Sequence, residues 1–355
     1  MNILSDFKKD IRTQKQIPGS YEWWYFDAQS VDDYSIVIIF YEGNPFSKRY
    51  IQGISSKINQ RAEYYPAISI SVYKKGKPIF YAFEEMLPGV CNFSETEPAG
   101  TTGGNRFKGK ISDGKLLYDV ILDHKLENGD RVEASLKFTS DVNEISLTGK
   151  NMEVSPAHLW NLVQPQAHVT GSISLSGYRD ETIHFSGKGY HDHNFGTEPM
   201  KETFDEWYWG RYHFDEMTLV YYLMNENNNW QKKAWLIDNL GSVVTIDSNG
   251  IQLSGSQISL FGLISSRSIE FKQTDFNAHL QLDRVTDNGP FYQRFEGRVL
   301  ATYNDKPHQA RGISEYIKPN RIYNKLYWPL VDMRIKYPGK THWVQKSPRL
   351  FRWTW

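Results

Sequence analysis

Three segments carry side chains whose types and spacing could do chemistry. Tyr21 to Asp27 reads Tyr-Glu-Trp-Trp-Tyr-Phe-Asp, and Glu206 to Arg211 reads Glu-Trp-Tyr-Trp-Gly-Arg. Between them, Gly189 to Gly196 reads Gly-Tyr-His-Asp-His-Asn-Phe-Gly, which adds acid, base and amide groups. Because adjacent tryptophans are costly to leave in water, we expect each aromatic segment to face a core or an apolar ligand.

The middle segment is the candidate catalytic segment. If it is a β-strand, residues two apart share a face, so Tyr190, Asp192 and Asn194 point one way while His191 and His193 point the other. A carboxyl group held in an apolar pocket has a raised pKa and can donate a proton at neutral pH. We therefore assign Asp192 as the candidate acid, with His191 or His193 tuning it and Tyr190 beside it. The alternative is a hydrogen-bonded knot that only joins the two halves of the chain.

The aromatic segments are candidate walls of a substrate pocket. Aromatic faces can bury an apolar chain and can also stabilise a passing cation. The same residues could instead form core, and Arg211 could make a structural ion pair with Asp192, Asp27 or Glu22. The candidate substrate-binding residues are Glu22, Trp24, Tyr25, Asn194, Trp207, Trp209, Arg211 and Tyr222.

Other kinds of site have little support in the sequence. His191 and His193 could place two imidazoles on one ion, but no third ligand is indicated, and the chain has no Cys pair or His-Glu-x-x-His pattern. It also lacks a Gly-x-Ser-x-Gly elbow, a Walker loop and a dinucleotide fingerprint. We therefore expect neither a metal nor a cofactor.

Composition narrows the class of protein. Lys plus Arg and Asp plus Glu both number 41 in the 355 residues, so nothing global indicates nucleic-acid binding. The single cysteine, Cys91, rules out an internal disulfide and fits a cytoplasmic location. No run of about 18 apolar residues occurs, and the first ten residues lack an apolar run of signal-peptide length.

The elements that must position the candidate residues are β-strands. Aromatic residues make up 15% of the chain, and β-rich runs such as Ser35 to Tyr41 and Ala167 to Leu175 recur between turn signals. We predict an all-β chain of closely spaced strands, which favours barrels or sandwiches. The start of the chain could form a short helix near residues 3–12.

A weak internal repeat divides the chain. Glu22 to Tyr25 corresponds to Glu206 to Trp209, and Gly189 to Asp192 corresponds to Gly312 to Glu315, although coincidence in a Trp-rich chain is the alternative. The predicted divisions are an N-terminal extension (1–17), an N-terminal domain (18–200), a C-terminal domain (201–317) and a tail (318–355).

The tail differs in composition from the rest of the chain. From Lys318 onward it holds nine Lys or Arg and one acid, Asp332, together with many aromatic residues. It could pack onto the barrels or bind an anionic membrane surface. We expect packing onto the protein, because the aromatic side chains need cover.

The three segments resemble the hydroxyneurosporene synthase family, also called carotenoid 1,2-hydratase-like proteins. The matching pieces are Gly19 to Ala28, Gly189 to Gly196 and Trp207 to Arg211, within residues 18–317. The resemblance implies two lipocalin-like antiparallel β-barrel domains packed side by side, with an apolar ligand pocket. The family and its looser relatives include carotenoid hydratases and natural-product cyclases, some of Diels–Alder type.

Two positions depart from the family pattern. Phe195 stands where the family usually has Trp. The strand Leu219 to Met224 has no acid, whereas carotenoid hydratases carry a Tyr-x-Asp or Tyr-Asp signature there. The second departure weakens the expectation that the substrate is a carotenoid.

Three functions fit these observations. The first is acid-initiated hydration or cyclisation of a long polyene or isoprenoid, which needs a neutral carboxylic acid and controlled access for water. The second is a pericyclic, Diels–Alder-type cyclisation, in which the pocket folds the substrate and no proton need move. The third is a non-catalytic carrier of lipid or isoprenoid cargo. The expected partner is a small hydrophobic molecule, with peripheral membrane contact as a further possibility.

Overall fold

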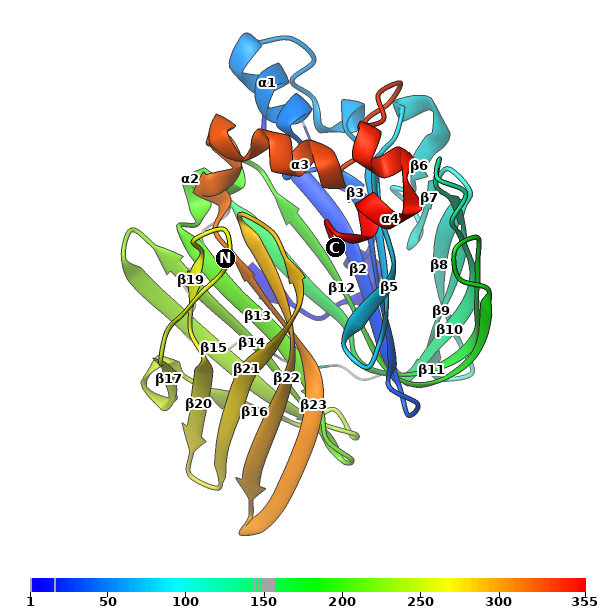
Figure 1. The fold of residues 1–355 in the computed structure, drawn as a ribbon. Coiled ribbons are helices and arrows are strands. Elements are labelled where there is room, and N and C mark those ends of the chain that lie inside the picture. Colours follow the sequence, from blue (N-terminus) through cyan, green and yellow to red (C-terminus); the bar gives the residue numbers. More distant parts are fainter. Residues whose placement is uncertain (1, 16, 143–144, 146, 148–156) are drawn as a thin grey trace. The chain divides into compact units, whose positions relative to one another are not determined.

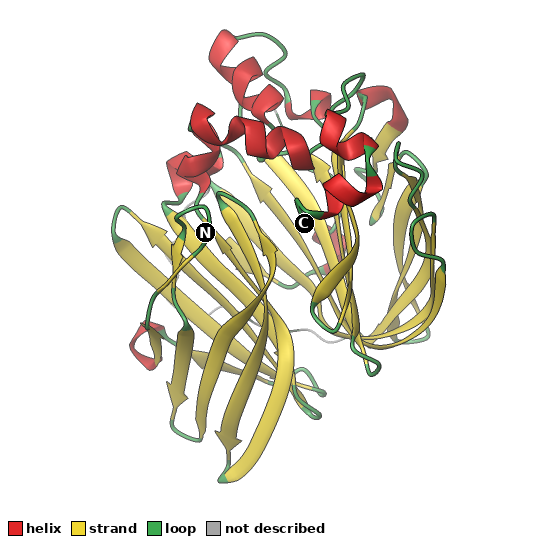
Figure 2. Ribbon diagram, viewed as in Figure 1, coloured by secondary structure: helices red, strands yellow, loops and turns green. Residues whose placement is uncertain are grey.

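Antiparallel strands dominate the computed structural model, which describes residues 2–15, 17–142, 145, 147 and 157–355 (Figure 2). The all-β prediction is confirmed, since one main sheet forms a half-barrel and the other a nearly closed barrel. The chain divides into two compact units. Unit 1 comprises residues 1–144, 152–200 and 326–355, and unit 2 comprises 145–151 and 201–325.

Unit 1 is built on one twelve-stranded sheet (Figure 1). Its strands are β1 (Asn2–Leu4), β2 (Tyr21–Ser30), β3 (Tyr34–Glu42), β4 (Ala67–Lys74), β5 (Lys77–Glu85), β6 (Cys91–Phe93), β7 (Ala99–Thr102), β8 (Asn105–Ser112), β9 (Lys115–Lys125), β10 (Arg131–Asp141), β11 (His158–Ser176) and β12 (Glu181–Gly196). They run in the order β5-β4-β3-β2-β12-β11-β10-β9-β8-β7-β6, and β1 pairs in parallel with β11. The candidate strands β2 and β12 are therefore direct neighbours.

The interior of unit 1 is aromatic. Trp24 and Phe26 of β2 lie on its inner face and are buried with Phe40, Phe107 and Tyr118. Successive side chains of a strand point to opposite faces, and the burial of most β2 residues shows that both faces of this strand are covered. Figure 1 shows short helices at one end of unit 1: α1 (Lys48–Ser56), α3 (Trp328–Arg334) and α4 (Pro348–Arg352).

Unit 2 is built on a nine-stranded sheet and a separate small hairpin. Its strands are β13 (Glu206–His213), β14 (Met217–Glu226), β15 (Asn229–Asp238), β16 (Val243–Ile246), β17 (Ile251–Ser254), β18 (Gln257–Ile258), β19 (Ile264–Ser265), β20 (Ser268–Gln273), β21 (Phe276–Asn288), β22 (Tyr292–Tyr303) and β23 (Lys306–Ile317). The sheet order is β16-β15-β14-β13-β23-β22-β21-β20-β17, and β18 pairs with β19. A one-turn helix, α2 (Met200–Thr203), precedes β13.

The strand register supports the internal repeat. In each unit the first aromatic strand pairs with the unit's last long strand, β2 with β12 and β13 with β23. Ala28 lies opposite Gly189 in unit 1, and Tyr212 lies opposite Gly312 in unit 2. These are the positions that correspond when the two sequence segments are aligned, so the repeat describes a shared topology and register.

Two further features concern the ends of the chain. The helix considered near residues 3–12 is not formed; β1 occupies its start, and only a single 3₁₀ turn follows at Phe7–Lys9. In the tail, Phe351 is buried in the core of unit 1, and Lys336 forms a bridge to Glu84 of β5. No helix among the described residues combines the length and apolar character needed to cross a membrane.

The pairing of β10 with β11 depends on a glycine. Gly171 has φ +151, and a Cβ built there would lie 1.9 Å from the backbone oxygen of Ser135. We expect Gly171→Ala to lower the free energy of unfolding by about 2 kcal/mol or more. Urea unfolding followed by circular dichroism would measure the change.

The matched control is Gly89→Ala. Nothing lies within 4 Å of a Cβ at Gly89 and the residue is exposed, so stability should change by no more than about 0.5 kcal/mol. Equal unfolding midpoints for the two variants would contradict the steric argument.

Candidate functional site

The two faces of β12 carry different chemistry, as the sequence predicts. His191 stacks on Phe26 with ring centroids 3.9 Å apart, and His193 stacks on Trp24 at 4.6 Å, so both histidines lie in the interior of unit 1. Asp192 projects from the opposite face of the strand, because side chains alternate. All of these residues are buried.

The interior histidines bind carboxylates from the N-terminal half of the chain. His191 Nε2 lies 3.0 Å from Asp10 Oδ2, and its Nδ1 donates to the backbone oxygen of Tyr25 at 2.9 Å. His193 Nε2 lies 2.8 Å from Glu22 Oε1, and its Nδ1 lies 3.3 Å from Asp10 Oδ1. Both histidines therefore lie in a different environment from Asp192, and the tuning of that acid by either histidine stays a prediction.

The same network continues outward through Lys15. Its ammonium group pairs with Glu22 and lies 2.5 Å from Glu42 Oε2. Glu42 also accepts from Arg12 Nε at 2.9 Å, and Arg12 pairs in turn with Glu95 at the surface. We call this set the buried ion network; it comprises Asp10, Arg12, Lys15, Glu22, Glu42, His191 and His193.

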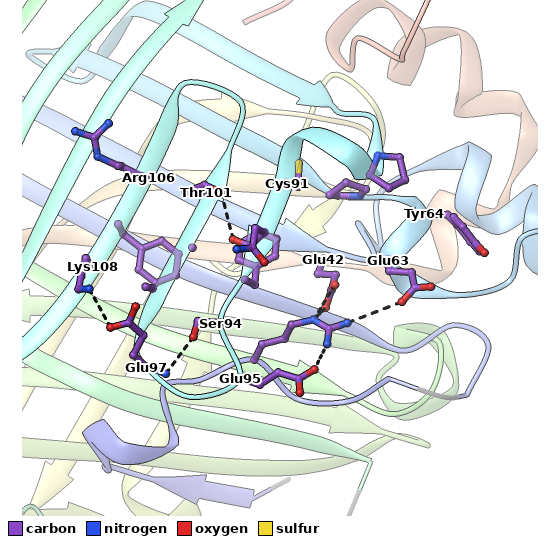
Figure 3. Close-up of a pocket in the computed structure, with 18 residues that line it drawn as sticks. Glu42, Glu63, Tyr64, Cys91, Ser94, Glu95, Glu97, Thr101, Arg106 and Lys108 are labelled. Atoms are coloured by element: carbon purple, nitrogen blue, oxygen red, sulfur yellow. Dashed lines mark hydrogen bonds and ion pairs between the residues drawn. The ribbon is translucent and has the colours of Figure 1, made fainter.

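The outer end of the buried ion network opens into a cleft of about 780 Å³ on unit 1 (Figure 3). Arg12 lines the cleft and pairs with Glu42, Glu63 and Glu95, the three carboxylates labelled in Figure 3. Cys91 also lines the cleft, where burial raises the pKa of its thiol to about 11. A thiol with so high a pKa is a poor nucleophile at neutral pH.

The pKa shifts of His193 and Asp10 show that opposite charges stabilise the buried ion network. Burial alone would lower the pKa of His193, but its contacts with Asp10 and Glu22 raise that pKa to about 9. Burial alone would raise the pKa of Asp10, but His191 and His193 lower it to about 2. The carboxylates and the His193 imidazolium are thus charged together at neutral pH.

Asp192 lies among neutral donors on the other face of β12. Its Oδ2 accepts from Tyr190 Oη at 2.6 Å and from Trp160 Nε1 at 2.7 Å, and its Oδ1 accepts from Asn194 Nδ2 at 2.8 Å. The ring of Tyr25 meets that of Tyr190 edge-on, with centroids 6.1 Å apart. The structure therefore brings Asp192, Tyr190, Asn194 and Tyr25 together, as the sequence predicts.

Some predicted substrate contacts lie in the interior of unit 1 instead. Trp24 is sandwiched between Phe93 and His193, each with a centroid distance of 4.6 Å. Glu22 is fully buried in the ion network, where Lys15 and His193 hold its pKa below the usual range although burial alone would raise it. A role for these two residues in substrate contact stays a prediction.

The remaining predicted substrate residues belong to unit 2. Tyr208 and Tyr212 of β13 face that unit's core, so Trp207, Trp209 and Arg211 occupy the other face of the strand. Tyr222 of β14 lies directly opposite Trp209 in the ladder. All four are buried, and the pairing of β13 with β14 brings them to one face of the unit 2 sheet.

Sequence reasoning missed Trp160 beside Asp192 and four members of the buried ion network: Asp10, Arg12, Lys15 and Glu42. Trp160, which donates to Asp192, lies on β11 in a segment without an unusual motif, and only the pairing of β11 with β12 reveals it. Asp10 and Lys15 lie in the N-terminal extension, which carried no functional signal. Among the residues that the structure describes, no cluster of three or more His, Cys, Asp or Glu is arranged to hold a metal ion.

Comparison with known proteins identifies the family to which the chain belongs. Residues 125–346, more than half of the chain, match the family model of carotenoid hydratase CrtC. The chain belongs to the carotenoid hydratase CrtC family. The match includes β12 with Asp192 and β13 with Arg211.

Individual relatives extend the match to the whole chain. A hydroxyneurosporene dehydrogenase of Chlorobaculum tepidum is 29% identical over 366 residues, covering 96% of this chain and 93% of that protein. An acyclic carotenoid 1,2-hydratase of Rhodobacter capsulatus is 31% identical over 205 residues, covering 57% of this chain and 66% of that protein. The crystal structure of an AttH protein from Nitrosomonas europaea shares the fold, with a TM-score of 0.60, 14% identity and coverage of 84% of this chain and 92% of that one.

Removing one cation should test whether the buried ion network stabilises unit 1. Lys15→Met leaves Glu22 and Glu42 without their shared ammonium group, so we expect the free energy of unfolding to fall by about 3–5 kcal/mol. Chemical denaturation would measure the loss. Lys108→Met is the matched control, because Lys108 pairs with Glu97 at 2.9 Å in an exposed position, where a pair contributes about 1 kcal/mol or less. Similar losses in both variants would contradict the argument.

The raised pKa of His193 predicts a pH dependence of stability. The folded chain holds the proton up to about pH 9, whereas an unfolded histidine releases it near its ordinary pKa of 6.5. The stabilisation is therefore complete below about pH 6.5 and is lost as the pH rises through 9, a loss on the order of 3 kcal/mol.

Denaturant unfolding between pH 6 and 9.5 would measure this dependence. A His193→Gln variant should be less stable than the wild type at pH 6 and should show a flatter profile. A profile as steep as that of the wild type would show that another group is responsible.

Proposed function

We propose that this protein hydrates a carbon–carbon double bond of a long apolar isoprenoid by acid catalysis, with Asp192 as the proton donor. Membership of the carotenoid hydratase family supports the reaction class. The observation that carries the residue assignment is the position of Asp192, which is buried among aromatic and amide side chains on the face of β12 that the ion network does not occupy.

In the first step Asp192 transfers its proton to the alkene. Protonation of a trisubstituted alkene at the less substituted carbon forms a new C–H bond and leaves a tertiary carbocation. Burial favours the neutral carboxyl that this step requires. The neutral Asp192 carboxyl can donate to the Tyr190 hydroxyl group, and the carboxylate can accept from it, because a hydroxyl group both donates and accepts hydrogen bonds.

In the second step a water molecule adds to the cation. As the C–O bond forms, the water loses a proton, and the Asp192 carboxylate accepts it and returns to the neutral acid. The sum is alkene plus water giving a tertiary alcohol, with the enzyme unchanged. Tyr190, Trp160 and Asn194 orient the carboxyl group for both transfers, which is the positioning that general acid–base catalysis needs.

The aromatic residues would support the cation. Tyr25 and Tyr190 lie on the Asp192 face of unit 1, and an aromatic face within about 6 Å of a cation attracts it. Substrate contact by Trp209 and Tyr222, which pair with each other in unit 2, stays a prediction from the sequence. Capture of the cation by a second alkene in place of water would give cyclisation by the same acid.

One sequence observation favours a different outcome. The strand β14 has no acid between Leu219 and Met224, so a pericyclic cyclisation, which needs no proton transfer, is the second candidate. A carrier without catalysis is the third. Hydration transfers a solvent-derived proton to a carbon of the product, whereas neither of these alternatives does, so this transfer distinguishes the functions.

Replacing the proposed acid should abolish hydration. We expect Asp192→Asn to lower kcat about 10²- to 10⁴-fold with little change in KM, because the acid acts only in the transition state. The assay supplies an acyclic carotenoid in detergent micelles and separates the alcohol by chromatography. In D2O the wild-type product should gain one deuterium on the carbon next to the new alcohol.

Two controls sharpen the result. Asp141→Asn alters an exposed carboxylate paired with Lys115 and should leave kcat unchanged. Trp160→Phe removes one hydrogen bond to Asp192 and should lower kcat less than Asp192→Asn does. Turnover by Asp192→Asn at the wild-type rate, without deuterium in the product, would support the pericyclic function, and binding without turnover by the wild type would support the carrier.

A further inference from the structure

The last residues of the chain present an exposed aromatic and cationic surface on unit 1. Trp353 is 89% exposed and Trp343 is 64% exposed, although tryptophan is a residue that proteins usually cover. Leu350 is 43% exposed beside them in sequence. We call this surface the tail patch; it comprises Lys340, Trp343, Lys346, Arg349, Leu350 and Trp353.

The tail patch lies on two short helical turns. Its exposed residues alternate in sequence with buried ones, and Ser347, whose backbone is extended, separates the two turns. The segment consists of a 3₁₀ turn over Trp343–Lys346 followed by α4. The buried residues between them, Val344 and Phe351, face the protein. The segment therefore buries one set of apolar side chains against the protein and exposes another set to solvent.

Contacts with unit 1 hold the segment in place, so its outer side is a fixed surface. Phe351 lies in the core, and Arg352 Nη2 pairs with Asp130 Oδ2 at 2.9 Å. Earlier in the tail, Lys336 Nζ pairs with Glu84 Oε1 at 2.7 Å. These contacts also neutralise the neighbouring acids, as does the pair between Lys48 and Asp332.

The three cations of the tail patch take no part in these ion pairs. Lys340, Lys346 and Arg349 are exposed, and within the described part of the chain none of the three forms an ion pair. Lys346 is attracted by Glu127, but that carboxylate already contacts Lys336 and Thr341. The patch therefore combines tryptophan and leucine with an uncompensated positive charge.

We propose that the tail patch docks the protein on the surface of an anionic lipid membrane. Tryptophan is the side chain that favours the membrane–water interface, because its ring is apolar and its N–H is polar. Lysine and arginine are attracted to anionic headgroups, by an amount that corresponds to about a fivefold change in affinity for each residue. Arg349, Leu350 and Trp353 follow the last residue matched by the family model, so the family match does not include them.

Membrane docking does not depend on the proposed reaction, because binding requires no turnover. It would bring the protein to the phase in which a long isoprenoid dissolves. Figure 1 places α3 and α4 at the end of unit 1 opposite the turn between β2 and β3. That turn carries Val31, which is 85% exposed and provides a comparison site.

Co-sedimentation with vesicles tests the proposal. The full chain is mixed with vesicles of phosphatidylcholine alone or of phosphatidylcholine with phosphatidylglycerol, at low and at high salt. We expect binding to the anionic vesicles only, weakened by salt, because salt screens exposed charges. Lys346→Glu with Arg349→Glu should lower the affinity about 25-fold or more, fivefold for each cation removed. Trp343→Ser with Trp353→Ser should also lower it at unchanged net charge.

Matched controls separate the patch from general surface effects. Lys110→Glu reverses an exposed charge on β8, and Val31→Ser removes an exposed apolar side chain, so both should bind vesicles like the wild type after a twofold charge effect at most. A wild-type protein that fails to bind anionic vesicles at low salt would overturn the proposal. So would patch variants that keep wild-type binding, or controls that lose as much as they do; circular dichroism verifies that each variant is folded.

Discussion

Compensation of charge inside unit 1 is the constraint on which much of the structure depends. Asp10, Glu22 and Glu42 are carboxylates removed from water, and each would be very costly alone. Lys15, Arg12 and His193 supply the opposite charge within hydrogen-bonding distance. Because these groups come from distant parts of the chain, the sheet and the N-terminal extension must be assembled together for the compensation to exist.

At the position that aligns with His191, unit 2 places neutral groups. The repeat aligns His191 with Ser314, whose hydroxyl group contacts the hydroxyl groups of Tyr212 and Tyr221 at 2.5 and 2.7 Å. Neutral hydroxyl groups can be buried as a satisfied network at lower cost than charges. The repeat also aligns Asp192 with Glu315, which pairs with Arg294 at 3.0 Å. Within unit 1, Asp192 accepts hydrogen bonds from Trp160, Tyr190 and Asn194.

The sequence predicts what depends on local alternation and misses what depends on long-range pairing. The β-strands, the opposite faces of His191 and Asp192 and the register of the repeat all follow from a period of two. Trp160 could not be predicted as a partner of Asp192, because two register shifts separate the ends of the β11–β12 pairing. Asp10 could not be predicted either, since an isolated acid in an N-terminal segment has no pattern that points to a histidine 181 residues away.

The inner face of β12 contributes to stability, and its outer face carries the proposed acid. On the inner face, His191 donates to the backbone oxygen of Tyr25 and thereby ties β12 to β2 at the level where Asp192 and Tyr25 lie opposite each other. On the outer face, burial favours a neutral Asp192, while hydrogen bonds from donors such as Trp160 and Asn194 favour the carboxylate. An acid that must give up a proton and then take one back needs both forms to be accessible. The ion pairs on the inner face fix the position of β12. A fixed strand preserves the balance between the neutral and ionised forms of Asp192, because small shifts of the carboxyl group would favour one form over the other.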